Sequence, residues 1–381
     1  MTKYRAGMRL TTLGLLSLAA ISVNAQIPDL LNSLDAGGRA MGVGGAFGVT
    51  DSATTSALQN PAGLGFITAP EVGLVFRNLP TSSRIVGGNF NNPISIGENS
   101  FGKRAVSHFG YVTPAHGGAI GISYTLGGYI DDSRNGTNLD NGLLRVDNYS
   151  ENTRAQTDFF TFSYGRNQGS VNWGFGIVLA NQYVANERSF VLVDPQTNQQ
   201  VGSSQTSVSD NGTGIGVVAG VQVVPSSNPN TSYALSIRTP INLSGNEDTS
   251  AFYDRIPGRA SFGFATRVDG AFRAEDFMVY GIQADYYFGG QENKVLARRN
   301  HLVLGAGVEY NMHRWNARFP IRLGFALVPS GGAGFEERNA FTFGLGYRPN
   351  NGRFGVDLNF ASPGGGPIDM SLGLNYTLKG F

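Results

Sequence analysis

From residue 71 onward, large apolar side chains alternate with small or polar ones along most of the chain. In the clearest stretch the large apolar positions are Val171, Trp173, Phe175, Ile177 and Leu179. The same alternation recurs at 71–78, 105–113, 117–130, 155–166, 213–224, 231–242, 258–268, 278–288, 302–310, 317–329, 341–348, 354–360 and 368–379. A period of two is typical of β-strands whose two faces meet different surroundings. The pattern predicts an all-β fold of about fourteen strands.

The predicted strands suit a membrane better than a soluble sandwich. Many have about 9–13 residues, whereas soluble strands usually have about 5–6 and tilted membrane strands about 9–11. Their large face is apolar and their other face is mostly glycine, serine, threonine and asparagine. A backbone in lipid must pair every polar group, which for strands requires closure. We therefore expect a transmembrane antiparallel barrel in residues 71–381, with the large side chains toward lipid.

Connection lengths support this prediction, because short and long links alternate along the chain. Short links fall near 113–117, 165–170, 226–230, 268–275, 312–317 and 350–353, and long ones at 131–153, 185–212, 243–257, 289–300, 329–339 and 361–367. Outer-membrane barrels have short periplasmic turns and long outer loops. An even number of strands places both ends of the barrel on the periplasmic side.

The stretch from Asp131 to Gly136 begins like a calcium-binding loop. Its twelfth position is Gly142 instead of the glutamate that an EF-hand loop requires, so the template fails. We expect a solvated outer loop here.

Residues 1–25 contain the successive regions of an export signal. Lys3, Arg5 and Arg9 precede an apolar stretch from Leu10 to Ser22, and Ala25 ends a cleavage site. Removing these residues leaves 25 Lys and Arg against 27 Asp and Glu. A near-neutral mature chain offers no electrostatic basis for binding nucleic acid.

Composition excludes several kinds of chemistry. The chain has no cysteine and four scattered histidines, which argues against a disulfide scaffold, a thiol nucleophile or a histidine-based metal site. No nucleophile elbow or phosphate-cradling loop is found. We therefore expect no catalytic residues, no metal, no cofactor and no enzyme activity.

Residues 26–70 do not follow the strand pattern. Glycine is dense between Gly37 and Gly48, and Asn60-Pro61 is a turn initiator. The lumen of a barrel with about fourteen strands is too wide for its own side chains to fill. A compact segment would fill it, and strand faces rich in glycine would leave room. We expect residues 26–70 to form a hatch inside the barrel.

The residues of this segment resemble a known family. Gly38-Arg39-Ala40, Gly44-Gly45-Ala46, Asp51 and Asn60-Pro61-Ala62 resemble the N-terminal hatch of the FadL/TodX family of outer-membrane transporters for hydrophobic compounds. These motifs are also similar to those of PorV/PorQ-like relatives, some of which serve protein secretion. The acidic pair that usually follows the glycines in the family is Thr50-Asp51 here, so one carboxylate is missing.

The resemblance implies a function in the bacterial outer membrane. A hydrophobic small molecule of the long-chain fatty acid type would enter from outside, and movement of the hatch or a strand kink would open an exit, including sideways into the membrane. The alternative is a PorV-like barrel that docks exported proteins as part of a secretion system. A general polar porin is disfavoured because the lumen is predicted to be plugged.

Alternation places several arginines toward the lumen. The candidates for binding substrate are Arg238, Arg267, Arg322 and Arg348. They would hold a ligand carboxylate, or they would form salt bridges, with residues such as Glu309 and Asp357, that anchor the hatch. The sequence leaves both interpretations open.

The C-terminal strand carries an assembly signal. A last amphipathic strand with Tyr376 and a terminal Phe381 resembles the signal read by the bacterial barrel-assembly machinery. Phe381 is one residue out of phase with Tyr376, and a bulge at Gly380 would restore the phase.

Overall fold

The chain forms a closed antiparallel barrel of 14 strands. The computed structural model describes residues 38–90, 92–250, 252, 254–291, 299–331, 337, 339–350, 352–363 and 368–378; the predicted signal sequence and Phe381 lie outside them. The barrel strands are β1 (Glu71–Asn89), β2 (Asn92–Ala115), β3 (Gly118–Gly136), β5 (Arg145–Gln168), β6 (Val171–Val193), β7 (Gln200–Val223), β8 (Thr231–Arg238), β11 (Gly258–Asp269), β12 (Phe277–Phe288), β13 (His301–Arg314), β14 (Ala317–Leu327), β15 (Ala340–Pro349), β16 (Phe354–Pro363) and β17 (Asp369–Thr377).

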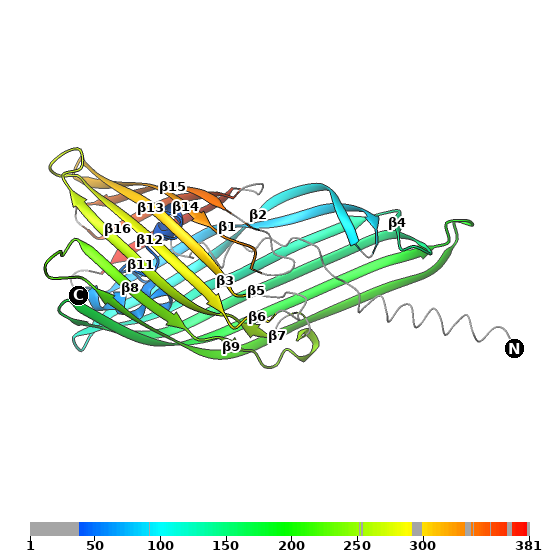
Figure 1. The fold of residues 1–381 in the computed structure, drawn as a ribbon, viewed down its shortest axis with the longest axis horizontal. Coiled ribbons are helices and arrows are strands. Elements are labelled where there is room, and N and C mark those ends of the chain that lie inside the picture. Colours follow the sequence, from blue (N-terminus) through cyan, green and yellow to red (C-terminus); the bar gives the residue numbers. More distant parts are fainter. Residues whose placement is uncertain are drawn as a thin grey trace.

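Strands pair with their neighbours in chain order, and β17 pairs with β1 to close the barrel (Figure 1). Minor elements complete the described chain: α2 (Gly38–Gly42), α3 (Ser56–Gln59), the 3-10 helices η1 (Pro61–Phe66) and η2 (Glu247–Thr249), and the short strands β4 (Leu139–Asp140), β9 (Ile241–Asn242) and β10 (Arg255–Ile256). In the described part of the chain, no helix is long and apolar enough to span a membrane.

The two faces of the strands are as predicted. On β6, Phe175 and Ile177 are each 55% exposed on the outside, whereas Val178 between two outward residues is 0% exposed. The strands β12, β13, β15 and β16 show the same alternation. Side chains that favour lipid thus cover the outside, and closure satisfies the backbone groups of the wall.

The short turns gather at one end of the barrel. Only two residues separate β2 from β3, β5 from β6 and β13 from β14. We call this the periplasmic end and the opposite one the extracellular end, since short turns mark the periplasmic side of outer-membrane barrels.

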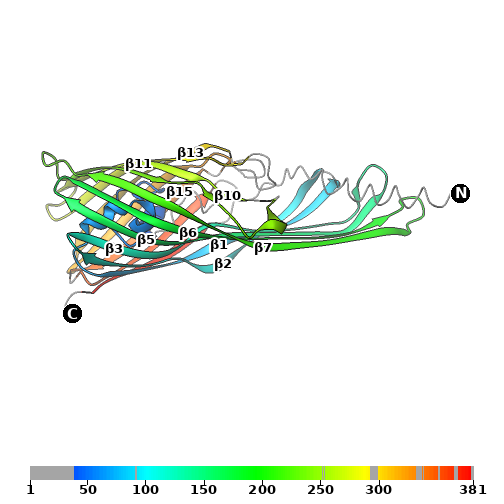
Figure 2. The same ribbon diagram turned by 90° about the horizontal axis from the view of Figure 1, so that it is seen from below.

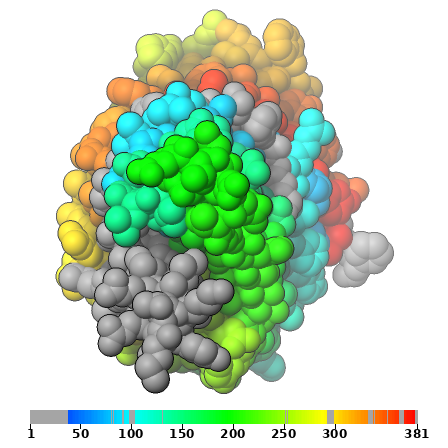
Figure 3. Space-filling view, turned by 90° about the vertical axis from the view of Figure 1, so that its right-hand side faces the viewer, coloured from blue at the N-terminus to red at the C-terminus, as the bar shows by residue number. Residues whose placement is uncertain are grey.

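At the extracellular end, the long connections predicted at 131–153 and 185–212 are wrong. Strands β5, β6 and β7 have 24, 23 and 24 residues and extend far beyond β8 and β11–β17 (Figure 1). Figure 3 looks onto this end, where the green surface of β6 and β7 stands in front. The apolar face ends where the membrane would end, but Ser, Thr and Val still favour the strand conformation and the neighbouring strands pair each other's backbones.

The predicted solvated loop at Asp131–Gly136 is also wrong. These residues belong to β3, and the side chain of Asp132 is 1% exposed. Arg134 Nε donates to Asp132 at 2.8 Å, and Arg84 Nε lies 3.6 Å from the same carboxylate. The charged side chains that the sequence predicted to be in solvent therefore form ion pairs within β3 and between β1 and β3.

Candidate functional site

Residues 38–70, here called the lumenal segment, lie inside the barrel toward its periplasmic end (Figure 2). Several of its apolar side chains are 0% exposed, namely Val43, Ala46, Val49, Ala57, Ala62 and Leu64. The segment runs from α2 through turns to α3 and η1, and β1 begins directly after it at Glu71. Its small residues let it fold tightly enough to fit within the wall.

Glycines on the inner faces of the strands make room for the lumenal segment. A side chain at Gly324 would overlap the backbone of Val43, and one at Gly174 would overlap that of Pro61. Comparable close approaches to the segment occur at Gly165, Gly220, Gly263, Gly281, Gly305 and Gly307. The glycine-rich strand faces therefore serve to admit backbone that lies against them.

Polar contacts fix the lumenal segment at several points. Asn60 caps the N-terminus of η1, where its Oδ1 accepts from Ala62 N at 3.2 Å. Its Nδ2 donates to Val49 O at 2.8 Å. From the wall, Ser163 Oγ donates to Ala57 O at 2.6 Å and Gln222 Nε2 donates to Thr50 O at 2.8 Å. Pro61 fits the first position of a helix because it has no N–H to satisfy. The motif Asn60-Pro61-Ala62 thus holds two turns of the segment together.

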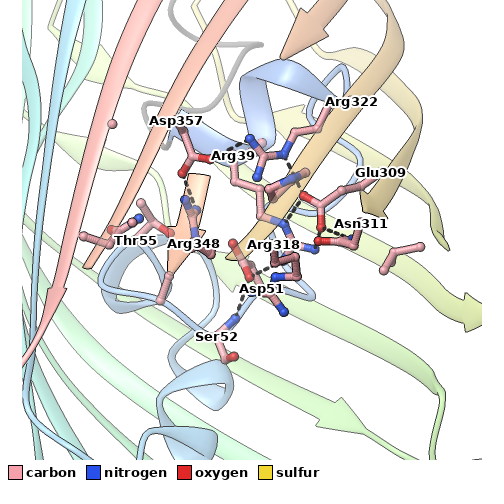
Figure 4. A pocket seen from close by; sticks show the side chains of 18 of the residues that line it. Arg39, Asp51, Ser52, Thr55, Glu309, Asn311, Arg318, Arg322, Arg348 and Asp357 are labelled. Atoms are coloured by element: carbon pink, nitrogen blue, oxygen red, sulfur yellow. Dashed lines mark hydrogen bonds and ion pairs between the residues drawn. The ribbon is translucent and has the colours of Figure 1, made fainter. Parts of the chain in front are cut away.

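Charged side chains link the lumenal segment to strands β13, β14, β15 and β16 (Figure 4). Arg39 Nε and Nη2 donate to the two carboxylate oxygens of Glu309 at 2.9 and 3.0 Å, and Arg39 Nη1 donates to Asp51 at 2.8 Å. Arg322 bridges Glu309 at 2.6 Å and Asp357 at 2.7 Å. Arg348 pairs with the second oxygen of Asp357. We call these six residues the lumenal ion network.

The lumenal ion network alternates in charge and is neutral, with three guanidinium groups and three carboxylates. Burial acts to lower the pKa of Arg39, but attraction to Glu309 and Asp51 outweighs it and raises that pKa above its ordinary value. Arg39 thus stays charged at any physiological pH. Its three strong hydrogen bonds offset the cost of desolvating it.

Of the four arginines predicted to bind substrate, three line one cavity, and Arg238 is not among its lining residues. Arg322 and Arg348 belong to the lumenal ion network, whereas Arg267 pairs with Asp269 at 2.6 Å. Arg238 Nη2 donates to Pro257 O at 3.0 Å, and its guanidinium carbon lies 4.5 Å from the centre of the Phe159 ring. For Arg322 and Arg348 these pairings favour an anchoring role over one in ligand binding.

The lumen is apolar toward its extracellular end. One cluster of buried apolar residues surrounds Leu58 of α3, and its members on the wall and on the connection after β8 include Phe159, Val178, Val184, Val218, Ile241 and Ile256. A second surrounds Met41 of α2 and includes Tyr287, Val303, Val328 and Ala340. These apolar side chains line the lumen together with buried Arg238 and Arg259, and the guanidinium of Arg238 lies over the ring of Phe159.

Toward its periplasmic end the lumen is polar. A cavity of about 670 Å³ lies there, bounded by the lumenal segment at Arg39 and Asp51 and by β12–β17. Its wall includes the charged members of the lumenal ion network and also Glu71, Arg267 and Arg318. Charged side chains thus line the cavity on the periplasmic side of the lumenal segment.

The barrel wall is interrupted between β2 and β3. Pairing of these strands runs only from Ala115↔Gly118 to His108↔Thr125. Beyond it, Gly127 is an unpaired bulge residue on β3, and pairing resumes where residues 82–86 of β1 lie parallel to 132–136 of β3. We call the gap between these two pairings the wall window.

Apolar side chains fill the wall window. Leu79, Leu126 and Tyr129 pack together there, with Ala105 against them. At its lower edge, the hydroxyl of Thr54 and the Nε2 atom of His108 are joined by a hydrogen bond of 3.0 Å, and the other ring nitrogen is joined to Thr125 at 3.0 Å. The lumenal segment is therefore in direct contact with the last strand pair below the window.

Sequence reasoning missed the wall window and one basic residue. Only Gly127-Gly128, a glycine pair inside a strand pattern, signalled a bulge. Arg318 lines the cavity but lies at the start of a strand, where its facing was not assigned. Tyr376 of the predicted assembly signal is 45% exposed and lies opposite Val72 and Phe354. Among the described residues, no group of metal-ligating side chains is present.

Comparison with known proteins finds relatives by structure only. No protein-family model and no curated protein matches the sequence. A FadL homologue from Pseudomonas aeruginosa matches with a TM-score of 0.62 at 13% identity, covering 93% of this chain and 99% of that one. The toluene transporter TbuX of Ralstonia pickettii matches with a TM-score of 0.57 at 12% identity, covering 92% and 100%.

The toluene transporter TodX of Pseudomonas putida gives a TM-score of 0.55 at 13% identity, with coverage of 93% and 99%. Each of these similar structures spans nearly the whole chain. The chain therefore has the fold of the FadL-type outer-membrane barrels, as the resemblance of its N-terminal motif predicted.

Proposed function

We propose that this protein is a bacterial outer-membrane channel for the passive uptake of hydrophobic small molecules. The observations that carry the proposal are the two apolar clusters around Leu58 and Met41 in the lumen and the apolar filling of the wall window. A hydrophobic molecule gains free energy in proportion to the apolar area it buries, so such a lining attracts it without an energy source.

The wall window provides the exit in this proposal. The periplasmic route would take a hydrophobic molecule past the lumenal ion network and into a polar cavity. The window is instead filled by Leu79, Leu126 and Tyr129, which can rotate aside without breaking backbone hydrogen bonds, because the strands are unpaired there. The molecule then moves sideways into the membrane.

The lumenal segment acts as the hatch in this mechanism. Its Thr54 touches His108, which belongs to the last pair of β2 and β3 below the window. A shift of the segment on ligand binding would therefore pull on the lower edge of the window. The long-range coupling is carried by one hydrogen-bonded chain from Thr54 through His108 to Thr125.

Two substrate classes are proposed. Toluene, the compound named for TbuX and TodX, represents monoaromatic hydrocarbons. Oleate represents the long-chain fatty acids that the hatch motif suggests. Both are hydrophobic enough for the apolar lining, and uptake of each is measured separately.

The experiment blocks the window with a bulky side chain. Ala105→Trp adds a ring beside Leu126 and Tyr129, whereas Ala219→Trp adds the same ring to an exposed, lipid-facing position on β7. Uptake of toluene or oleate by cells that express the protein is expected to fall about tenfold with the first variant and to stay unchanged with the second. Equal uptake by both variants, at equal surface abundance, would reject lateral exit.

A second candidate function, docking of an exported protein, is favoured by the free edge of β7. The backbone of Thr213 exchanges two hydrogen bonds with Ser244, on the side away from β6. Because the register with β6 is unbroken from 202 to 223, the backbones of residues 203, 205, 207, 209 and 211 point to the same side. No described strand pairs with them there, and residues 200–212 contain no Lys, Arg or Pro to protect the edge.

An extended polypeptide could add to this edge as a further strand. Ser207→Pro would remove an outward N–H without breaking the ladder to β6, and Ser207→Thr is the matched control that keeps the N–H. If docking is the function, the proline variant lowers the amount of exported protein at the cell surface and leaves toluene uptake intact. Unchanged export by the proline variant would reject this candidate.

A further inference from the structure

Arg318 differs from the other arginines that line the periplasmic cavity. Arg39, Arg322, Arg348 and Arg267 each have a carboxylate within salt-bridge distance. Among the described residues, Arg318 has none and makes no hydrogen bond, and its Nε atom is buried. Its guanidinium carbon lies 5.7 Å from the centre of the Phe277 ring, which is its one specific contact. Buried polar atoms without a partner are uncommon and call for an explanation.

We propose that Arg318 and His313 form an anion-binding site in the periplasmic cavity, and that the site takes a carboxylate. The two residues lie directly opposite each other on β14 and β13, where those strands approach their short turn. His313 Nδ1 is likewise buried without a hydrogen-bond partner in the described structure. Two unpartnered nitrogen groups thus line one cavity from neighbouring strands.

The hairpin of β13 and β14 has three inward-facing pairs along this wall. Glu309 faces Arg322, Asn311 faces Pro320, and His313 faces Arg318. The first pair is a salt bridge, and Asn311 donates to Glu309 at 3.0 Å. The pair nearest the periplasm has a basic residue, Arg318, but no acid to balance it. An anion between His313 and Arg318 would complete the series.

The acids around the cavity cannot take that place. Asp51, Glu309 and Asp357 already serve Arg39, Arg322 and Arg348. Glu71 lies on β1, and β15, β16 and β17 separate it from β14 along the wall. Asp269 is half-exposed and paired with Arg267, whose guanidinium lies 3.9 Å from the centre of the same Phe277 ring. Asp276 is buried beside the pair, but its carboxylate accepts from His313 N at 2.9 Å and from the hydroxyl of Tyr310, and no ion pair joins it to Arg318. Among the described residues, the guanidinium of Arg318 therefore has no acid as a direct partner.

A carboxylate suits the site better than a larger multivalent anion. A guanidinium presents parallel N–H groups that match the two oxygens of a carboxylate. Phe277, between Arg267 and Arg318, offers an apolar surface to the group that carries the acid. The cavity, at about 670 Å³, is large enough for a short-chain acid with its first waters. The carboxylate comes from a free small anion of the periplasm or from the head of an amphipathic acid.

The experiment measures binding to the full-length mature protein in lipid nanodiscs by calorimetry. The probes are acetate, octanoate and octanol, and empty nanodiscs correct for partition into lipid. We expect octanoate to bind, and Arg318→Gln to weaken it about tenfold, which corresponds to about 1.4 kcal/mol. Arg318→Lys keeps the charge and is expected to retain most of the affinity. Arg154→Gln, at an exposed position on β5, is the control and is expected to change nothing.

The probes separate the sources of the carboxylate. Binding of acetate with the affinity of octanoate supports a free anion, and binding of octanoate alone supports an amphipathic acid. Octanol binding must not respond to Arg318→Gln, since octanol has no charge for the guanidinium to hold. The inference is overturned if the wild-type protein binds neither acid, or if Arg318→Gln binds octanoate as the wild type does while its melting temperature is unchanged. Because no uptake is measured, the result is independent of the proposed transport.

Discussion

Arg39 and Glu309, 270 positions apart in the chain, form a two-pronged ion pair in which Nε and Nη2 of the arginine donate to both oxygens of the carboxylate. The same guanidinium reaches Asp51 through Nη1. One side chain thus fastens the lumenal segment to the barrel wall and to itself. Arg39 thus pairs with a carboxylate of β13 as well as with Asp51, the one acid that follows the glycines of the segment.

We predict that Arg39→Gln loosens the lumenal segment and raises ion leakage. Glutamine cannot satisfy Glu309 and Asp51 together, and Arg322 would be the one cation left beside Glu309 in the lumenal ion network. The cost is expected to lie below the about 3–5 kcal/mol of a buried charge that loses its one partner. Conductance in planar lipid bilayers is expected to rise several-fold, while the barrel itself stays folded, because its wall does not depend on the pair. Deleting residues 36–62 sets the upper limit of the leakage.

Arg154→Gln is the matched control for Arg39→Gln, because Arg154 is 64% exposed and its ion pair with Asp131 is long, at 3.5 Å. Its conductance is expected to equal that of the wild type. A closed channel in the Arg39 variant would mean that the glycine contacts and hydrogen bonds alone hold the segment in place.

We predict that Gly324→Val displaces the lumenal segment from the wall. The new side chain would overlap the backbone of Val43, which has no flexible atoms to move away. Gly202→Val on β7 adds the same atoms where the nearest neighbour, Leu192, would be 3.6 Å from the new Cβ. Protease cleavage within residues 38–70 is expected to be faster in the first variant only. Equal cleavage of both proteins would show that the segment tolerates added bulk.

The alternation of side chains was enough to predict the barrel, the number of its strands and which face of each strand points outward. The alternation identifies strands within the membrane because one face of each strand contacts lipid and must be apolar. Phe175 and Ile177 therefore alternate with glycines. It fails in the extension of β5–β7. There the start of β7 is mostly polar, and the apolar side chains of β5 and β6 are few, although Tyr149 and Phe190 pack in a small cluster with Phe90. The pattern therefore predicted a loop over 185–212, although residues 185–193 and 200–212 pair as two strands joined by a turn at 194–199.

The site was harder to predict, because it depends on which residues meet across the fold. The motif around Asn60 and the glycines indicated a segment packed against backbone, and periodicity placed Arg322 and Arg348 toward the lumen. Neither pattern predicts that Glu309 would meet Arg39, or that β2 would pair with β3 only from His108 to Ala115. The lack of a partner for Arg318 is likewise a property of the assembled wall and not of its neighbours in sequence.

We predict that Asp132→Asn detaches the β1–β2 hairpin from β3. Asp132 is the carboxylate that Arg134 and Arg84 share, and it lies where β1 and β3 pair in parallel. Its loss leaves two buried arginines with less compensation, which favours local opening over global unfolding. Hydrogen exchange at residues 82–86 is expected to become faster, and exchange in β11–β16 to stay unchanged. Unaltered exchange at 82–86 would show that the backbone pairing alone holds the hairpin.

Phe175→Arg tests the orientation on which the whole interpretation rests. Phe175 is 55% exposed on the outside of β6, near the middle of its membrane-spanning part. An arginine on the lipid face near the bilayer midplane costs about 2–4 kcal/mol. Ser207→Arg, on the outward face of β7 in the extension, places the same charge in water and is expected to cost under about 1 kcal/mol. Both free energies of unfolding are measured by denaturant titration in lipid vesicles. If the two variants were equally stable, residue 175 would lie outside the lipid, and neither the lateral exit nor an apolar entry from the extracellular side would remain tenable.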